Sequence, residues 1–170
     1  CIMGYLLDEI ESVNAEKVHG CKTDVQVQVT IKLKNLIDAQ NLQVKLVSNK
    51  SGFNQIDKRW VDRYAELWQM PDNIKSIFKR YTGEDKPTID NPKDYRRMYA
   101  HEFDNEEQQH ILKWLEEHKS LIVSDILKGR GQFAAEWMLV IQKVGKSYNW
   151  TLKPMNFCLN YFGNAKVEIT

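Results

Sequence analysis

Cysteine is scarce in this chain, and its three copies exclude two kinds of protein. Cys1, Cys21 and Cys158 are odd in number, and none belongs to a Cys-x-x-Cys pair. They therefore form neither the disulfide framework of a small secreted domain nor a cysteine-rich zinc site. We interpret them as reduced thiols and predict a cytoplasmic protein.

Long apolar runs and the common nucleotide-binding motifs are also missing. No apolar segment approaches the roughly 20 residues that span a bilayer, and the first residues (CIMGYLLDEIES) turn acidic too early for a signal peptide. GxGxxG, GxSxG and P-loop patterns do not occur, and the four histidines lack the HExxH spacing of a metalloprotease. The lack of a long apolar run predicts a protein with no membrane partner.

What remains is the composition of an ordinary globular domain, with 42% hydrophobic and 28% charged residues. A chain of 170 residues can bury one sizeable core, so we predict a single domain over residues 1–170. The formal net charge of +1 does not indicate nucleic-acid binding. Its distribution is uneven, because residues 22–63 hold eight Lys or Arg against four Asp or Glu. A basic face suits a phosphate backbone, although many proteins that bind no nucleic acid have one.

Two alternating segments predict neighbouring β-strands. Residues 26–33 (QVQVTIKL) and 41–48 (NLQVKLVS) alternate polar and apolar side chains, as half-buried strands do. The polar segment 35–40 (NLIDAQ) predicts the turn between them. Because strand side chains repeat every two residues, Gln43 and Lys45 project to the same side, roughly 6–7 Å apart. An antiparallel pair would bring Asp24 near Gln43.

A carboxylate, an amide and a lysine at one sheet edge suggest metal-dependent phosphodiester hydrolysis. Carboxylate and amide oxygens are hard ligands for magnesium. A lysine ammonium polarises a water molecule or stabilises charge that develops on a phosphoryl group. The alternative is that Gln43 and Lys45 are solvated side chains on an ordinary strand, and spacing alone favours this alternative.

The rest of the chain predicts helices around a sheet. Residues 5–17 read as the tail of a helix or an entry segment, and 82–94 as a loop. Periodicity predicts helices at 56–68, 72–81, 104–117, 121–128 and 154–163. It predicts a strand buried on both faces at 137–144, a neighbouring strand at 149–153 and the start of a strand at 165–170. The expected fold class is α/β (α+β), a central mixed β-sheet flanked by helices.

Asp24, followed after eighteen residues by Gln43-Val44-Lys45, resembles the metal-site signature of the PD-(D/E)XK nuclease superfamily, in the variant with Gln as the second group. Longer segments resemble the HinP-type restriction endonucleases, which cut GCGC: Thr23-Asp24, residues 41–60, RRMYAHEF (96–103) and ILKGRGQFAAEWMLV (126–140). The resemblance spans most of the chain in one register, with Thr23 where such enzymes have Ser. These enzymes begin earlier and continue further, so we expect residues 1–170 to lack N- and C-terminal portions of the full protein.

The resemblance implies a type II restriction endonuclease that acts on double-stranded DNA at a short palindromic site, GCGC, as a monomer or weak homodimer. Mg²⁺ would be held by Asp24, the side-chain carbonyl of Gln43 and the backbone carbonyl of Val44. Lys45 would orient the attacking water or help to deprotonate it. Thr23 would contact the nearby phosphate.

Candidate DNA contacts follow from chain position and side-chain chemistry. The loop after the second strand and the start of the next helix carry polar or basic candidates at Lys50, Asn54, Gln55 and Lys58. Phe53 is a candidate wedge between base pairs, or else it packs on the core while Asn54 caps the helix. Arg96 and Arg97 are candidate phosphate ligands, or salt-bridge partners of Glu84 or Asp85. Arg130, between two glycines, is a candidate groove or phosphate contact, or part of a tight turn.

Two other functions stay open. A repair or recombination nuclease of the same superfamily would tolerate many sequences, whereas a restriction enzyme yields discrete fragments. A truncated DNA-binding fragment would leave its substrate intact even with magnesium.

Overall fold

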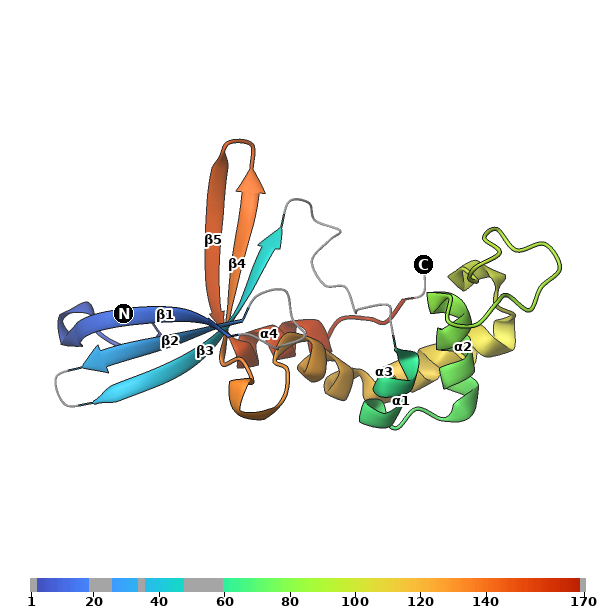
Figure 1. Cartoon of the computed structure of the whole chain (residues 1–170), viewed down its shortest axis with the longest axis horizontal. Helices are drawn as coiled ribbons and strands as arrows, with labels where there is room; N and C mark the ends of the chain where they lie inside the picture. Colours follow the sequence, from blue (N-terminus) through green and yellow to red (C-terminus); the bar gives the residue numbers. More distant parts are fainter. Residues whose placement is uncertain (1–2, 19–25, 34–35, 48–59, 169–170) are drawn as a thin grey trace. The chain divides into compact units, whose positions relative to one another are not determined.

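The structure, a computed structural model, describes residues 3–18, 26–33, 36–47 and 60–168. Its contacts divide the chain into two compact units. The first comprises Cys1–Gln55 and Val123–Asn164, and the second comprises Ile56–Ile122 and Ala165–Thr170. The first unit contains the sheet and the second is helical (Figure 1). The prediction that residues 1–170 form a single domain stays a prediction.

The first unit is built on a mixed five-stranded sheet with the strand order β1-β2-β3-β4-β5. The strands are β1 (Ile10–Val18), β2 (Gln26–Leu33), β3 (Ile37–Val47), β4 (Trp137–Val144) and β5 (Ser147–Pro154). Strand β3 pairs in parallel with β4, and the other neighbouring pairs are antiparallel. With the four α-helices of the described residues, this sheet confirms the predicted α+β fold class.

Strand β3 changes partners along its length. Residues Ile37 to Gln43 pair with β2, and residues Leu42 to Val47 pair with β4. Figure 1 shows the consequence, with β1 and β2 beside one half of β3 and the β4–β5 hairpin beside the other half. Among the described residues of β3, only Leu42 and Gln43 have strand partners on both sides.

An apolar cluster lies on each face of the sheet, while most of β1 and β5 is exposed. One face holds Val29, Ile31 and Leu42, against which Trp137 and other partly buried side chains pack. The opposite face is covered by helix α4 (Met155–Gly163) and the end of helix α3 (Asn105–Leu127). Its buried cluster is formed by Leu127, Ala135, Met138, Met155 and Cys158. Cys158 is a free, buried thiol, and burial raises its pKa, which keeps it protonated and unreactive.

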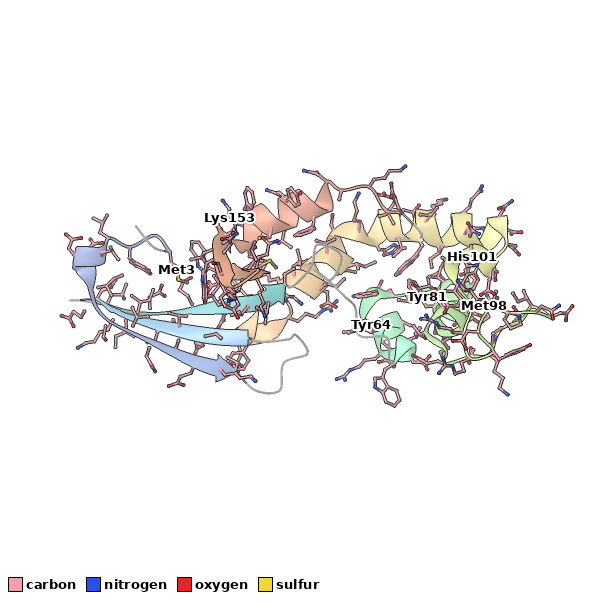
Figure 2. The ribbon with its side chains drawn as sticks, turned by 90° about the horizontal axis from the view of Figure 1, so that it is seen from above. Met3, Tyr64, Tyr81, Met98, His101 and Lys153 are labelled. Carbon is pink, nitrogen blue, oxygen red and sulfur yellow. The ribbon has the colours of Figure 1, made fainter. Side chains whose placement is uncertain are left out.

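The second unit packs helices α1 (Val61–Trp68) and α2 (Asp72–Thr82) with most of α3. Arg80 of α2 is its central polar side chain and is 9% exposed. It forms an ion pair with Glu107 of α3, donates to the Thr88 hydroxyl over 3.1 Å, and lies 5.2 Å from the Phe103 ring centroid. Arg80 thereby joins α2 to α3 and to the loop between them. Figure 2 labels Tyr64, Tyr81, Met98 and His101 of this unit.

Several predicted elements agree with the structure. The structure confirms the strands at 26–33 and 137–144 and the antiparallel pairing of the first two predicted strands. It also confirms the helix at 72–81 and the helix after Pro154. The strand beside 137–144 is also confirmed and is longer than predicted. Helix α1 begins at Val61, and the earlier part of the helix predicted at 56–68 lies largely outside the described residues.

Other predictions were wrong. Residues 10–18 form an edge strand and not the tail of a helix, because backbone pairing with β2 overrides local preference. Residues 37–40 extend β3 where a turn was predicted. Helix α3 runs unbroken to Leu127, since no proline or glycine interrupts it before Gly129, whose φ of 74° is left-handed. Strand β4 is mostly half-buried, and residues 165–168 form no strand.

No helix in the described part of the chain has both the length and the apolar character needed to cross a membrane.

Candidate active site

Gln43 is the most unusual polar residue of the sheet. Its side chain is 1% exposed on β3, and its backbone pairs with Gln26 on one side and Met138 on the other. Neither Oε1 nor Nε2 has a hydrogen-bond partner among the described residues. A buried amide that is left unpaired costs free energy of about 1–3 kcal/mol. Such a group needs an explanation, and a bound ion or water molecule is one of those commonly found.

Lys45 lies two residues further along β3, on the same face. It pairs with Val140 of β4 and is 7% exposed, although a lysine is rarely this buried. Strand alternation places both side chains on the face of Met138, which belongs to the cluster beneath α4. The predicted juxtaposition of Gln43 and Lys45 on one face is therefore present. The alternative that both are solvated surface side chains does not fit their burial.

Val44, the residue between them, is partly buried and points to the other face. The role predicted for Val44 uses its backbone carbonyl, so the direction of its side chain does not bear on that prediction.

Asn41 positions the start of this segment, and the sequence analysis did not single it out. Its side chain donates to the carbonyl oxygens of Gln132 and Ala134 over 3.1 and 3.4 Å, and accepts from the Gln28 amide over 3.2 Å. Its backbone carbonyl accepts from the N–H of Glu136 over 2.8 Å. Asn41 therefore ties β3 to β2 and to the connection that leads into β4. An Asn followed by an alternating strand was the only signal in the sequence, and it indicated no such role.

The remaining predicted site residues of this region lie outside the described residues. They are Thr23, Asp24, Lys50, Phe53, Asn54, Gln55 and Lys58. Asp24 precedes Gln26, the backbone partner of Gln43, by two residues in the sequence.

The predicted arginines differ in their surroundings. Arg96 forms a two-point ion pair with Asp94, at 3.1 Å from Nε and 3.0 Å from its terminal nitrogen, and this lowers the pKa of Asp94 to about 2. Arg96 therefore pairs with Asp94 and not with Glu84 or Asp85. Arg97 lies over the Tyr99 ring, 4.6 Å from its centroid. Arg130 forms an ion pair with Asp125, and its side chain is 45% exposed.

The donor set near Gln43 can be tested against a magnesium ion. Magnesium binds through one or two carboxylates and neutral oxygens and keeps several waters. The unpaired Oε1 of Gln43 is a neutral oxygen with free acceptor capacity, so it fits this role. In the described part of the chain, no three His, Cys, Asp or Glu side chains gather as a metal site. A complete site would therefore need a carboxylate from elsewhere, and Asp24 is the nearest acid in the sequence to the paired residue Gln26.

Comparison with known proteins identifies one family. The model of the R.HinP1I restriction endonuclease family matches residues 3–170, nearly the whole chain. A search of curated proteins finds no match.

Proposed function

The chain belongs to the R.HinP1I restriction endonuclease family, and we propose that it cuts at GCGC with Mg²⁺ as cofactor. As a member of this family it is a type II site-specific deoxyribonuclease that acts on double-stranded DNA. We further propose that Asp24, Gln43, Lys45 and Thr23 carry the reaction. The proposal includes a cytoplasmic location and a monomer or weak homodimer.

One observation carries the assignment of the catalytic face. Gln43 is buried without a hydrogen-bond partner among the described residues, beside a buried lysine. Unsatisfied buried polar groups are rare in native proteins and concentrate at functional sites. A purely structural role for Gln43 would be served better by an apolar side chain of the same volume, which would avoid the cost of the unpaired amide.

In this proposal, Asp24, the Gln43 Oε1 and the Val44 backbone carbonyl hold the cofactor. Asp24 lies two positions before Gln26 in the sequence, a span of about 7 Å in an extended chain, which is short enough for the carboxylate to reach the Gln43 amide. When bound, a divalent ion polarises the scissile phosphate and lowers the pKa of a coordinated water. Gln in place of a second acid leaves the site with one negative charge fewer, which weakens its attraction for the cation.

Lys45 and Thr23 act on the substrate directly. The Lys45 ammonium donates a hydrogen bond to the attacking water, orients it in line with the leaving oxygen, and stabilises negative charge as it grows on the phosphate. Because Lys45 is 7% exposed, its charge acts in a medium of lower effective dielectric than water, which strengthens this effect. The Thr23 hydroxyl donates to a non-bridging oxygen of the phosphate.

A plasmid digest tests the proposal. The chain is incubated with a plasmid of known sequence in Mg²⁺ and in EDTA, beside Lys45→Ala, and the fragment ends are sequenced. We expect discrete fragments with ends inside GCGC in Mg²⁺ alone, and intact plasmid with the variant. Lys113→Ala, a change on the outside of α3, is the matched control and should cut normally.

Each other outcome identifies a competing function. Ends spread over many sequences would contradict the GCGC assignment and favour a repair or recombination nuclease. Binding without cleavage under every metal condition would favour a truncated, non-cleaving fragment.

A further inference from the structure

A cluster of cations surrounds one tyrosine in the helical unit. Lys93 Nζ lies 4.8 Å and the Arg97 guanidinium carbon 4.6 Å from the centroid of the Tyr99 ring. The His101 ring stacks on Tyr99 with centroids 6.0 Å apart and planes inclined by 28°. We call Lys93, Arg97, Tyr99 and His101 the Tyr99 cluster; Figure 2 labels His101. One aromatic ring therefore contacts two cations, whose charges an external anion would neutralise.

The backbone that carries the cluster is fixed in place. The Glu102 carboxylate accepts from the N–H groups of Lys93 and Tyr99, each over 2.6 Å. The N–H of Met98 donates to the Arg80 carbonyl over 2.8 Å, which attaches the segment to α2. The cluster is therefore preorganised, so little conformational entropy would be lost when it binds a partner.

Its two cations differ from most others in the same unit. Lys75, Lys79, Arg80, Arg96, Lys113 and Lys119 all form ion pairs with carboxylates. Within the described residues, Lys93 and Arg97 have no carboxylate within ion-pair distance. Three acids close to them in the sequence have other hydrogen-bond partners: Asp94 pairs with Arg96, Glu102 accepts from backbone N–H groups, and Asp104 accepts from the N–H of Glu107. Lys93 and Arg97 thus keep their charge available for an external anion.

We propose that the Tyr99 cluster is a second DNA-binding site, which binds phosphates of the double-stranded substrate through Lys93 and Arg97. The inference rests on the proposed function for the identity of the anion, and it adds a contact separate from the catalytic face of β3. Phosphate is the target because the two cations lie over the Tyr99 ring and leave little of it for a base to stack on. Contacts to phosphate position a protein without reading sequence. The cluster therefore contributes affinity and register, while GCGC is read elsewhere.

Binding measured as a function of salt tests this site. The double variant Lys93→Gln/Arg97→Gln is compared with Lys75→Gln/Lys113→Gln, which removes the same two charges from paired lysines. Fluorescence anisotropy follows a duplex with GCGC and one without it, in EDTA so that the DNA stays intact. Each lost phosphate contact lowers the slope of log K against log salt by about 1. We expect the Tyr99-cluster variant to lose about 2 from the slope, equally on both duplexes, and the control variant to keep it.

Two further measurements separate the possible causes. Circular dichroism must show an unchanged fold, and Lys93→Arg/Arg97→Lys, which keeps both charges, should retain the slope. In Mg²⁺ we expect the glutamine variant to show a raised KM with kcat unchanged, since the reacting atoms are untouched.

The outcomes distinguish this inference from the proposed function. If the wild-type chain cuts at GCGC and the glutamine variant keeps the full salt slope, the inference is overturned and the function stands. If the wild-type chain binds with the expected slope and the variant loses it, but no cleavage occurs, the inference stands and the proposed function fails. If the salt slope fell on the GCGC duplex alone, the cluster would read bases, and its role as a phosphate-binding site would be overturned.

Discussion

Gln43 and Lys45 are buried together on one face of β3, at 1% and 7% exposure, two residues apart in the strand. The amide lies where β3 has neighbours on both sides, and the lysine lies where the parallel pairing with β4 continues. Polar side chains rarely occupy such positions unless they are paired or used in catalysis. This relationship is the basis of the first two predictions.

Lys45→Ala should reduce the rate of DNA cleavage by about 100-fold or more, which is the usual contribution of a positioned proton-transfer or charge-stabilising group. DNA affinity should change little, because the ammonium acts on the reacting water and phosphate. Single-turnover kinetics with a labelled GCGC duplex measures the rate, and anisotropy measures the affinity. Normal cleavage by the variant would remove Lys45 from the mechanism.

Gln43→Met should raise the free energy of unfolding by about 1–2 kcal/mol, because it replaces an unpaired buried amide by an apolar side chain of similar shape. The same change should abolish cleavage, since the neutral oxygen is lost. Urea denaturation measures stability, and Val140→Ile is the control for repacking on this face. A destabilised variant would mean that the Gln43 amide has a partner in the folded protein.

Gln43→Glu should bind Mg²⁺ more tightly than the wild-type chain, because a carboxylate adds one negative charge at the metal. Titration calorimetry in the absence of DNA follows the affinity without relying on turnover. Equal affinities would show that residue 43 does not contact the ion.

Arg80→Ala should destabilise the helical unit by about 3 kcal/mol. The change removes one partner of a partly buried ion pair and leaves Glu107 without its cation. Thermal unfolding followed by circular dichroism measures the loss, with the exposed Lys113→Ala as the control. A change within error of the control would show that solvent compensates for Arg80.

Tyr5→Phe should make the sheet less resistant to acid. The Tyr5 hydroxyl donates to Asp38, and this bond, followed by one from Gln40, holds the pKa of Asp38 below its ordinary value. A carboxyl group whose pKa is lowered on folding stabilises the folded state at pH values above its pKa in the unfolded chain. This stabilisation is lost as the pH falls through the pKa of the folded state. Stability measured from pH 7 to pH 3 should therefore fall at a higher pH in the variant. Parallel wild-type and variant curves would contradict the coupling.

The sequence predicted the parts of this structure that depend on local pattern. Alternation revealed β2, because one face of that strand meets a core. It also revealed the half of β3 that carries Gln43 and Lys45, although there both polar side chains are buried and the apolar Leu46 is exposed. It did not reveal β1, whose residues 11–17 are all exposed and whose conformation comes from pairing with β2. Nor could it indicate the roles of Asn41 and the Tyr99 cluster. These depend on contacts with residues distant in the sequence, or on ring geometry that spacing does not encode.

The parallel pairing of β3 with β4 joins segments separated by residues 48–136. A local hairpin forms in microseconds, but this pair must wait until a long intervening chain has closed its loop. We expect the burial of Gln43 between β2 and β4 to be completed late in folding, because a chain that ends before Trp137 has no β4. Under the proposed function, a partly synthesised chain without β4 lacks one of the two strands that flank Gln43, and we expect it not to cut DNA.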